Sequence, residues 1–179
     1  LGGDSDNAYG FISGNDSYPE IFVGRFSAET VAHVQTQVQR VLDYEINPES
    51  SSWIKNGIGI ASNEGSGDDG EWDFEHVRNM NIDLLNYNYI SCSELFDSTF
   101  GGLDLPNNPT PLMVANEVNS GAGVILYTGH GSTYSFSTSG FSTIGVNNLT
   151  NVGKLPFIWA TACLNGNFNN LKTRSELMK

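Results

Sequence analysis

Two stretches, VILYTGHGS (residues 124–132) and LPFIWATACLNG (residues 155–166), carry the clearest information about the fold of this chain. Each segment is a short apolar run, rich in β-branched and aromatic residues, that ends in small residues and one reactive side chain. Such runs are typical of buried strands in a parallel sheet. If the two strands are neighbours and point the same way, His130 and Cys163 emerge side by side at the carboxyl edge, where open α/β sheets bind ligands.

A thiol beside an imidazole permits nucleophilic catalysis. The thiolate is the nucleophile, and an ion pair with an imidazole favours it. The same imidazole can protonate a departing amine, so the pair suits acyl transfer from peptides. We predict that the amides of Gly131 and Cys163 form the oxyanion hole. The alternative is a buried core thiol at Cys163 and a loop histidine at His130, because free cysteine is among the most buried residue types.

The length and composition favour one acidic domain. A chain of 179 residues suffices for a single core, so we predict one catalytic domain over residues 1–179. The net charge of −12 disfavours nucleic acid and anionic membranes as partners, and matches cationic ligands such as calcium and basic peptide side chains. No apolar run is long enough to span a membrane. The first and last residues resemble neither a natural start nor a natural end, so we expect a fragment with further C-terminal residues.

Periodicity predicts alternating strands and helices. Besides the two strands above, we expect strands at 20–26, 57–62 and 89–95, and helices at 27–46, from 71 or 72 onward, and at 111–119. Ser27 is the expected N-cap of the first helix, and Thr110-Pro111 begins the last, which Gly121 ends. Residues 132–143 read as a polar loop. This alternation predicts a three-layer α/β/α sandwich with a mainly parallel sheet.

Two acidic residues follow the strand predicted at 57–62. Glu64 lies at the same sheet edge as His130, where a carboxylate can orient an imidazole; the alternative is a solvated loop carboxylate. Asp73 opens the next helix, where an acid complements the helix dipole. A carboxylate in a pocket can instead pair with a guanidinium.

Four short phrases resemble one family of peptidases. The two strand blocks, ending in His-Gly and Ala-Cys, resemble the caspase-like clan of cysteine peptidases. Within that clan the chain is similar to the gingipain family, and more to its arginine-specific than its lysine-specific members. The phrases are EIFVGRFS (20–27), IASNEG (60–65), YTGHGS (127–132) and ACLNG (162–166). The resemblance covers nearly the whole chain and includes the spacing between the histidine and the cysteine.

The resemblance implies a caspase-like fold and a cysteine endopeptidase that cleaves after a basic residue, arginine preferred. It implies that Glu64 contacts the catalytic histidine and that Asp73 reads the arginine side chain at P1, the residue before the cleaved bond. Trp72 and Thr128 are the other expected substrate contacts, although Trp72 is also compatible with a core position. The loop between Glu64 and Asp73 looks shorter than in the family, which leaves the depth of the pocket open.

The resemblance also implies structural calcium. Asp4, Ser13, Asp16, Tyr18 and Glu20 match a gingipain calcium site, and hard cations take such oxygen ligands. The segment between Asp4 and Ser13 looks shorter than in the family, and Asp/Asn-rich turns also arise for conformational reasons. A secreted or cell-surface bacterial enzyme, made as a zymogen with its own pro-segment as a partner, is the expectation that follows.

Two other functions remain open from the sequence. The first is a related cysteine peptidase with a different P1 preference, such as lysine or a small residue, including a maturation peptidase. The second is an inactive, calcium-stabilised relative that binds partners without cleaving them.

Overall fold

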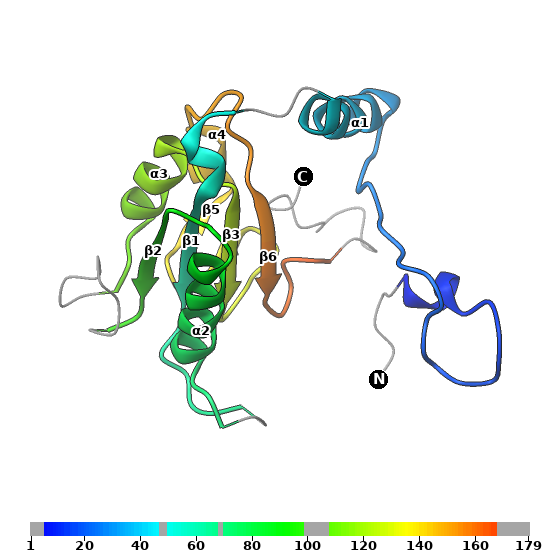
Figure 1. The fold of residues 1–179 in the computed structure, drawn as a ribbon, viewed down its shortest axis with the longest axis horizontal. Coiled ribbons are helices and arrows are strands. Elements are labelled where there is room, and N and C mark those ends of the chain that lie inside the picture. Colours follow the sequence, from blue (N-terminus) through cyan, green and yellow to red (C-terminus); the bar gives the residue numbers. More distant parts are fainter. Residues whose placement is uncertain (1–5, 47–49, 68–69, 99–107, 168–179) are drawn as a thin grey trace.

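A four-stranded parallel sheet forms the centre of the molecule (Figure 1). The computed structural model describes residues 6–46, 50–67, 70–98 and 108–167. The strands are β1 (Asn56–Ala61), β2 (Ser91–Phe96), β3 (Val124–Thr128) and β6 (Phe157–Thr161), in the spatial order β2-β1-β3-β6. All three neighbouring pairs are parallel. The two apolar runs that carry His130 and Cys163 therefore lie side by side and point the same way, as predicted.

Helices cover both faces of this sheet. Helix α2 (Asp73–Asn86) packs on one face, and α3 (Pro111–Ser120), with the short α4 (Thr143–Asn147) beside it, lies on the other (Figure 1). The α2 face of β1 carries small residues: a Cβ atom at Gly59 would meet the side chain of Val77 on α2. The predicted three-layer α/β/α arrangement with a parallel sheet is confirmed.

The ends of α3 follow the sequence signals. Thr110 caps the helix, since its hydroxyl accepts a hydrogen bond from the Met113 amide at 3.3 Å. Pro111 is the first helical residue, and Gly121 ends the helix with φ of 106°, a conformation that favours glycine.

The segment predicted to be a polar loop after His130 contains a small hairpin. Strands β4 (Ser135–Phe136) and β5 (Phe141–Ser142) pair antiparallel, and α4 follows directly. Phe136 is buried, and its ring stacks on that of Tyr127 with centroids 4.0 Å apart. The contact between Phe136 and Tyr127 thus anchors residues 132–143 to β3, although the composition of this segment is mainly polar.

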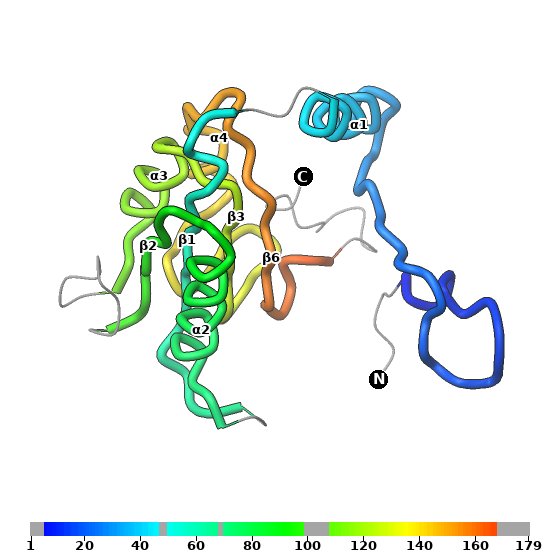
Figure 2. Tube along the Cα trace, viewed as in Figure 1, coloured from blue at the N-terminus to red at the C-terminus, as the bar shows by residue number. Residues whose placement is uncertain are grey.

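The N-terminal segment, residues 6–46, lies apart from the sheet, beyond β6 (Figure 2). The strand predicted at 20–26 does not form, and no strand within the described residues pairs with it. Helix α1 (Val31–Ile46) begins four residues after Ser27, so Ser27 is not its N-cap. The hydroxyl of Thr30 accepts from the His33 amide at 3.2 Å instead, because threonine next to the first turn also caps well.

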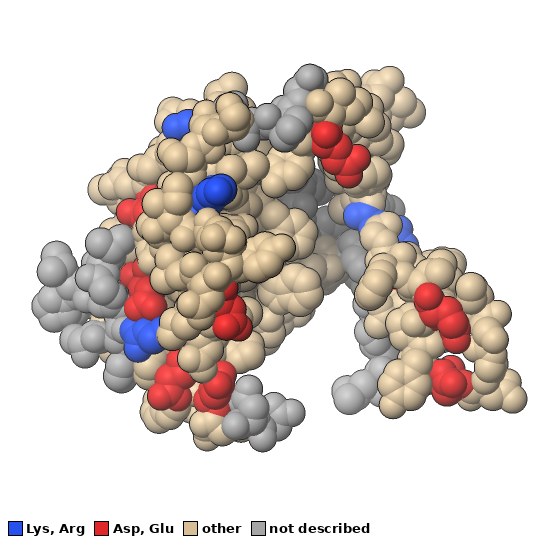
Figure 3. All heavy atoms as spheres, viewed as in Figure 1, with Lys and Arg blue, Asp and Glu red and all other residues tan. Residues whose placement is uncertain are grey.

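Two 3-10 turns complete the described elements, at Asn7–Gly10 and Ser52–Lys55. Acidic side chains lie on the α2 side of the sheet and on the N-terminal segment (Figure 3). Among the described residues, none of the helices has the length and apolarity needed to cross a lipid bilayer.

Candidate active site

The carboxyl ends of the four strands gather the predicted catalytic side chains at one edge of the sheet. From β1 the chain crosses by α2 to β2 on one side, and β3 then returns to the other side of β1. The strand order therefore reverses between β1 and β3, which is where open α/β sheets form a ligand-binding crevice. Glu64 follows β1 and His130 follows β3, so these two residues flank the reversal point.

The register of β3 and β6 brings the histidine and cysteine loops together. Thr128 pairs with Thr161, and each reactive residue lies two positions beyond this pair. The Gly129 amide extends the contact by donating to the Thr161 carbonyl at 3.2 Å. His130 and Cys163 are both exposed, so the alternative of a thiol sealed in the core is wrong.

The loops after β3 and β6 are also tied together by Asn165, a residue whose role the sequence did not suggest. Its amide nitrogen donates to the carbonyls of Ser132 at 2.7 Å and Ser135 at 3.1 Å. A Cβ atom at position 131 would collide with the Asn165 amide and the Ala162 methyl group. Only glycine therefore permits this close approach, which brings Gly131 against the residue before the thiol.

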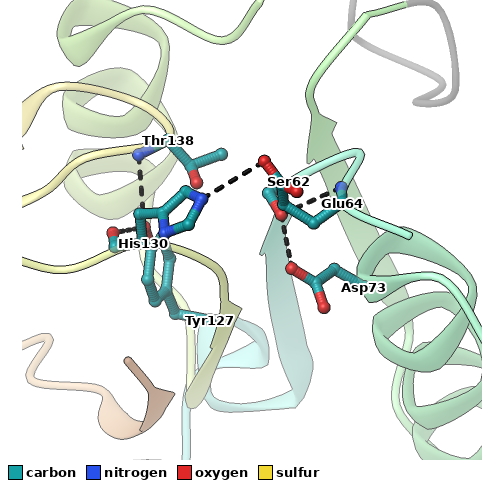
Figure 4. Close-up of polar contacts among 6 residues, drawn as sticks. All are labelled: Ser62, Glu64, Asp73, Tyr127, His130 and Thr138. Atoms are coloured by element: carbon teal, nitrogen blue, oxygen red, sulfur yellow. Dashed lines mark hydrogen bonds and ion pairs between the residues drawn. The ribbon is translucent and has the colours of Figure 1, made fainter. Parts of the chain in front are cut away.

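The carboxylate of Glu64 contacts the imidazole of His130. The Oε1 and Nε2 atoms are 3.2 Å apart, and the two side chains are 61% and 65% exposed (Figure 4). An exposed pair of this kind contributes little to stability, but it orients the ring. Since Nε2 faces Glu64, Nδ1 is the ring nitrogen left for the thiol. Among the described residues no hydrogen bond joins His130 to Cys163, a common state of catalytic pairs without substrate.

The side chain of Tyr127 holds the backbone at His130 in place. Its buried hydroxyl donates to the His130 carbonyl at 2.5 Å and accepts from the Thr138 amide at 3.2 Å (Figure 4). Burial raises the pKa of this phenol, with smaller opposing effects from Thr138. The hydroxyl therefore stays protonated and keeps its donor role at neutral pH.

Asp73 is the first residue of α2, close to the carboxyl end of β1. Its carboxylate accepts a short hydrogen bond from the Ser62 hydroxyl, which also accepts from the Glu64 amide at 3.2 Å (Figure 4). Ser62 was not among the residues singled out from the sequence. The two predicted functional acids are thus joined through a serine that follows β1 directly.

The two remaining predicted substrate contacts lie at the same edge. Trp72 precedes α2 and is 42% exposed, with its ring 6.1 Å from that of Phe74, so it is not a core residue. Thr128 ends β3, and its carbonyl accepts from the Ser62 amide at 3.0 Å. Both positions lie at the carboxyl edge of the sheet, and their contacts with substrate remain predictions.

A third carboxylate, which the sequence reading missed, lies at the end of β2. The Asp97 amide donates to the Ala61 carbonyl at 2.9 Å, and its Oδ1 atom is buried with no hydrogen-bond partner among the described residues. The pKa of this carboxyl is raised to about 6, mainly by burial and to a smaller extent by the charge of Glu64, whereas His130 acts to lower it. The only sequence signal was an acid directly after an apolar strand.

We expect the variant Asp97→Asn to change how stability depends on pH. A raised carboxyl pKa means that the folded protein holds the proton more tightly than the unfolded chain between pH 3.8 and about 6. The free energy of unfolding of the original protein should therefore fall as pH rises through this window, and the variant should lack that fall. Above pH 6 we expect the variant to gain about 1–2 kcal/mol, a value discounted for partial exposure.

Urea titrations between pH 4 and 7.5 measure this difference, with Asp83→Asn, an exposed position on α2, as the control. Parallel stability curves for Asp97→Asn and the original protein would contradict the assigned ionisation of Asp97.

The predicted calcium ligands lie on the exposed N-terminal segment. Asp16 accepts from the Tyr18 amide and Glu20 from the Ile12 amide, each at 2.9 Å. Asp4 lies outside the described residues. Within those residues, no three or more His, Cys, Asp or Glu side chains gather closely enough to hold a metal ion. Ser13, Asp16, Tyr18 and Glu20 offer the hard oxygen atoms that calcium prefers, so the donor chemistry fits, while the assembled site remains a prediction.

Known proteins resemble the chain over almost its entire length. Gingipain R2 and gingipain R1 of Porphyromonas gingivalis are each 39% identical over 167 residues, which is 92% of this chain. The chain covers 22% of the first relative and 16% of the second, so it spans a minor part of each.

Two solved structures share its fold. A complex of the Porphyromonas gingivalis RgpB pro- and mature domains matches with a TM-score of 0.84 and 37% identity, over 96% of this chain and 39% of that one. The Arg-specific cysteine proteinase gingipain R (RgpB) matches with a TM-score of 0.83 and 38% identity, over 93% of this chain and 37% of that one. The sequence profile described as peptidase family C25 matches residues 2–178. The chain therefore belongs to peptidase family C25.

Proposed function

We propose that this chain carries the catalytic centre of a cysteine endopeptidase that cleaves proteins after arginine. The observation that supports this most directly is the shared sheet edge: His130 and Cys163 follow paired positions on adjacent parallel strands, and Glu64 contacts the imidazole. Related proteins named as gingipains, one of them described as an Arg-specific cysteine proteinase, add to this support.

In the proposed reaction the thiolate of Cys163 attacks the carbonyl carbon of the cleaved bond. The amides of Gly131 and Cys163 donate to the resulting oxyanion. His130, oriented by Glu64, gives its proton to the departing amine as the carbon–nitrogen bond breaks and an acyl-enzyme thioester remains. Water, deprotonated by the same imidazole, then hydrolyses the thioester and restores the thiol.

Asp73 is the proposed partner of the P1 side chain. Its carboxylate lies at the start of α2, and it accepts a hydrogen bond from Ser62 at the carboxyl edge of the sheet. A guanidinium can pair with a carboxylate through two parallel hydrogen bonds. Trp72, which is 42% exposed, and Thr128 are proposed to contact the substrate on either side of this pair.

A panel of fluorogenic peptides that differ only at P1 tests this proposal on the full-length protein. We expect kcat/KM to be highest for arginine and lower for lysine, with citrulline, which has the shape of arginine but no charge, cleaved poorly. Equal cleavage of arginine and citrulline peptides would remove Asp73 from its role. Failure to cleave any member of the panel would favour a relative that binds partners without cleaving them.

Calcium, secretion and a zymogen form are further parts of the proposal. Support for calcium comes from the donor chemistry at Ser13, Asp16, Tyr18 and Glu20, with Asp4 as the remaining predicted ligand. Support for a secreted or cell-surface protein and for a pro-segment partner comes from the gingipain relatives and from the solved complex of pro- and mature domains.

We expect removal of calcium to lower the melting temperature of the full-length protein by several degrees, because an ion that binds only the folded state stabilises it by mass action. Calorimetry with EGTA, followed by added calcium or magnesium, measures the shift, and only calcium should restore it. The double variant Asp16→Asn, Glu20→Gln should show no such shift. An unchanged melting temperature in EGTA would contradict the site.

A further inference from the structure

Ser62 occupies the junction between β1, β3 and α2. It follows the last residue of β1, and its amide donates to the Thr128 carbonyl at 3.0 Å, which continues the pairing of β1 with β3. The residue is only 2% exposed. A polar side chain buried at this point needs partners within the protein.

The hydroxyl finds both of its partners among the predicted functional residues. The Glu64 amide can only donate, so the Ser62 oxygen is the acceptor of that 3.2 Å bond. A serine hydroxyl has one hydrogen, and the short contact with Oδ2 of Asp73 uses it (Figure 4). The Ser62 side chain therefore has no hydrogen left to donate to a substrate. Any effect of Ser62 on substrate binding must pass through Asp73 or Glu64.

The bond to Ser62 restricts the rotation of the Asp73 carboxylate. Oδ2 is held toward the end of β1, which fixes the plane of the carboxylate and leaves Oδ1 as the oxygen that Ser62 does not engage. We infer that Ser62 is a positioning residue that holds the Asp73 carboxylate in one plane and thereby makes the pocket select a guanidinium over an ammonium. This inference rests on the proposed role of Asp73 at P1.

The two basic side chains differ in how much they depend on that plane. A guanidinium is flat, and its donors form a rigid fork that must be aligned with the carboxylate. An ammonium is a compact charge with three donors that rotate freely, so it tolerates a carboxylate that turns. Loss of the Ser62 hydroxyl should therefore weaken recognition of arginine more than recognition of lysine.

The test compares arginine and lysine peptides on the full-length protein with the variant Ser62→Ala. We expect kcat/KM for arginine to fall about tenfold and the arginine-to-lysine ratio of kcat/KM to fall at least about fivefold. Each ratio is measured on one sample with both substrates, so it does not depend on how much of the sample is folded. The variant Ser62→Cys replaces the hydroxyl by a slightly larger thiol that donates only weakly. Ser62→Cys should also lower the arginine-to-lysine ratio of kcat/KM. It therefore provides the same test if the alanine variant does not fold.

Ser93→Ala is the matched control: Ser93 lies on β2, the strand next to β1, and its hydroxyl also donates to a carboxylate, that of Glu117 on α3, at 2.6 Å. The arginine-to-lysine ratio of kcat/KM for Ser93→Ala should equal that of the original protein. An unchanged ratio in the Ser62 variants, with normal arginine cleavage by the original protein, would overturn the role of Ser62 alone. No cleavage after arginine by the original protein would instead overturn the proposed function, and this inference with it.

Discussion

Replacing Cys163 by alanine is expected to abolish peptide cleavage, with a loss in kcat of about 10⁴-fold or more. The reason is that the proposed reaction passes through a covalent thioester, which no other side chain at this edge of the sheet can form. Cleavage of an arginine peptide by the full-length variant measures the loss. Substantial remaining activity would contradict the assignment of the nucleophile.

Chemical labelling provides an independent readout of the same assignment. The chain has two cysteines, and Cys163 is exposed whereas Cys92 is half-buried on β2. Burial raises the pKa of the Cys92 thiol, which slows its reaction with alkylating agents. A peptidyl chloromethyl ketone with arginine at P1 should therefore modify Cys163 first, as peptide mass spectrometry would show. Cys92→Ala should retain both labelling and cleavage.

The second large effect is expected for Asp73→Asn. Asparagine keeps the shape of the side chain and its carbonyl can still accept from Ser62, so the substitution removes mainly the negative charge. Loss of one partner from a charged hydrogen-bonded pair costs about 3–4 kcal/mol, which corresponds to a fall in kcat/KM for arginine peptides on the order of 10²–10³-fold. Peptides with an uncharged P1 residue should be cleaved at nearly the original rate.

Asp83→Asn is the control for Asp73→Asn, because it makes the same change at an exposed position on the same helix. It should leave the whole P1 profile unchanged. If Asp73→Asn cleaved arginine peptides as well as the original protein does, another group would have to read the P1 side chain.

The strongest local signals in the sequence predicted the fold well. Each apolar run that ends in small residues forms a strand of the parallel sheet, and Thr110, Pro111 and Gly121 mark the ends of α3 as expected. These features depend on neighbours close in sequence. The prediction of a strand at 20–26 was wrong, because a strand also needs a partner strand and apolar alternation alone does not supply one.

The candidate site was predictable to the extent that it depends on strand ends. Glu64 and His130 each follow a buried strand, which predicted that they share one edge of the sheet; their contact, at 3.2 Å, was expected from the family resemblance. Ser62, Asp97 and Asn165 were missed because their roles depend on which way a side chain points after the strand ends. In a single sequence, a buried serine that bridges two acids looks the same as a serine in any turn.

The position of β6 has a consequence for how the molecule responds to heat. Within the described residues it is the outermost strand beyond β3, and Phe157, Trp159 and Thr161 on one side of it are exposed. Outer strands with few buried contacts open at a lower free energy than the rest of a fold. The proposed nucleophile, the sulfur of Cys163, therefore follows a strand whose outer side has few contacts among the described residues. Local fraying there would separate it from the imidazole while the centre of the protein stayed intact.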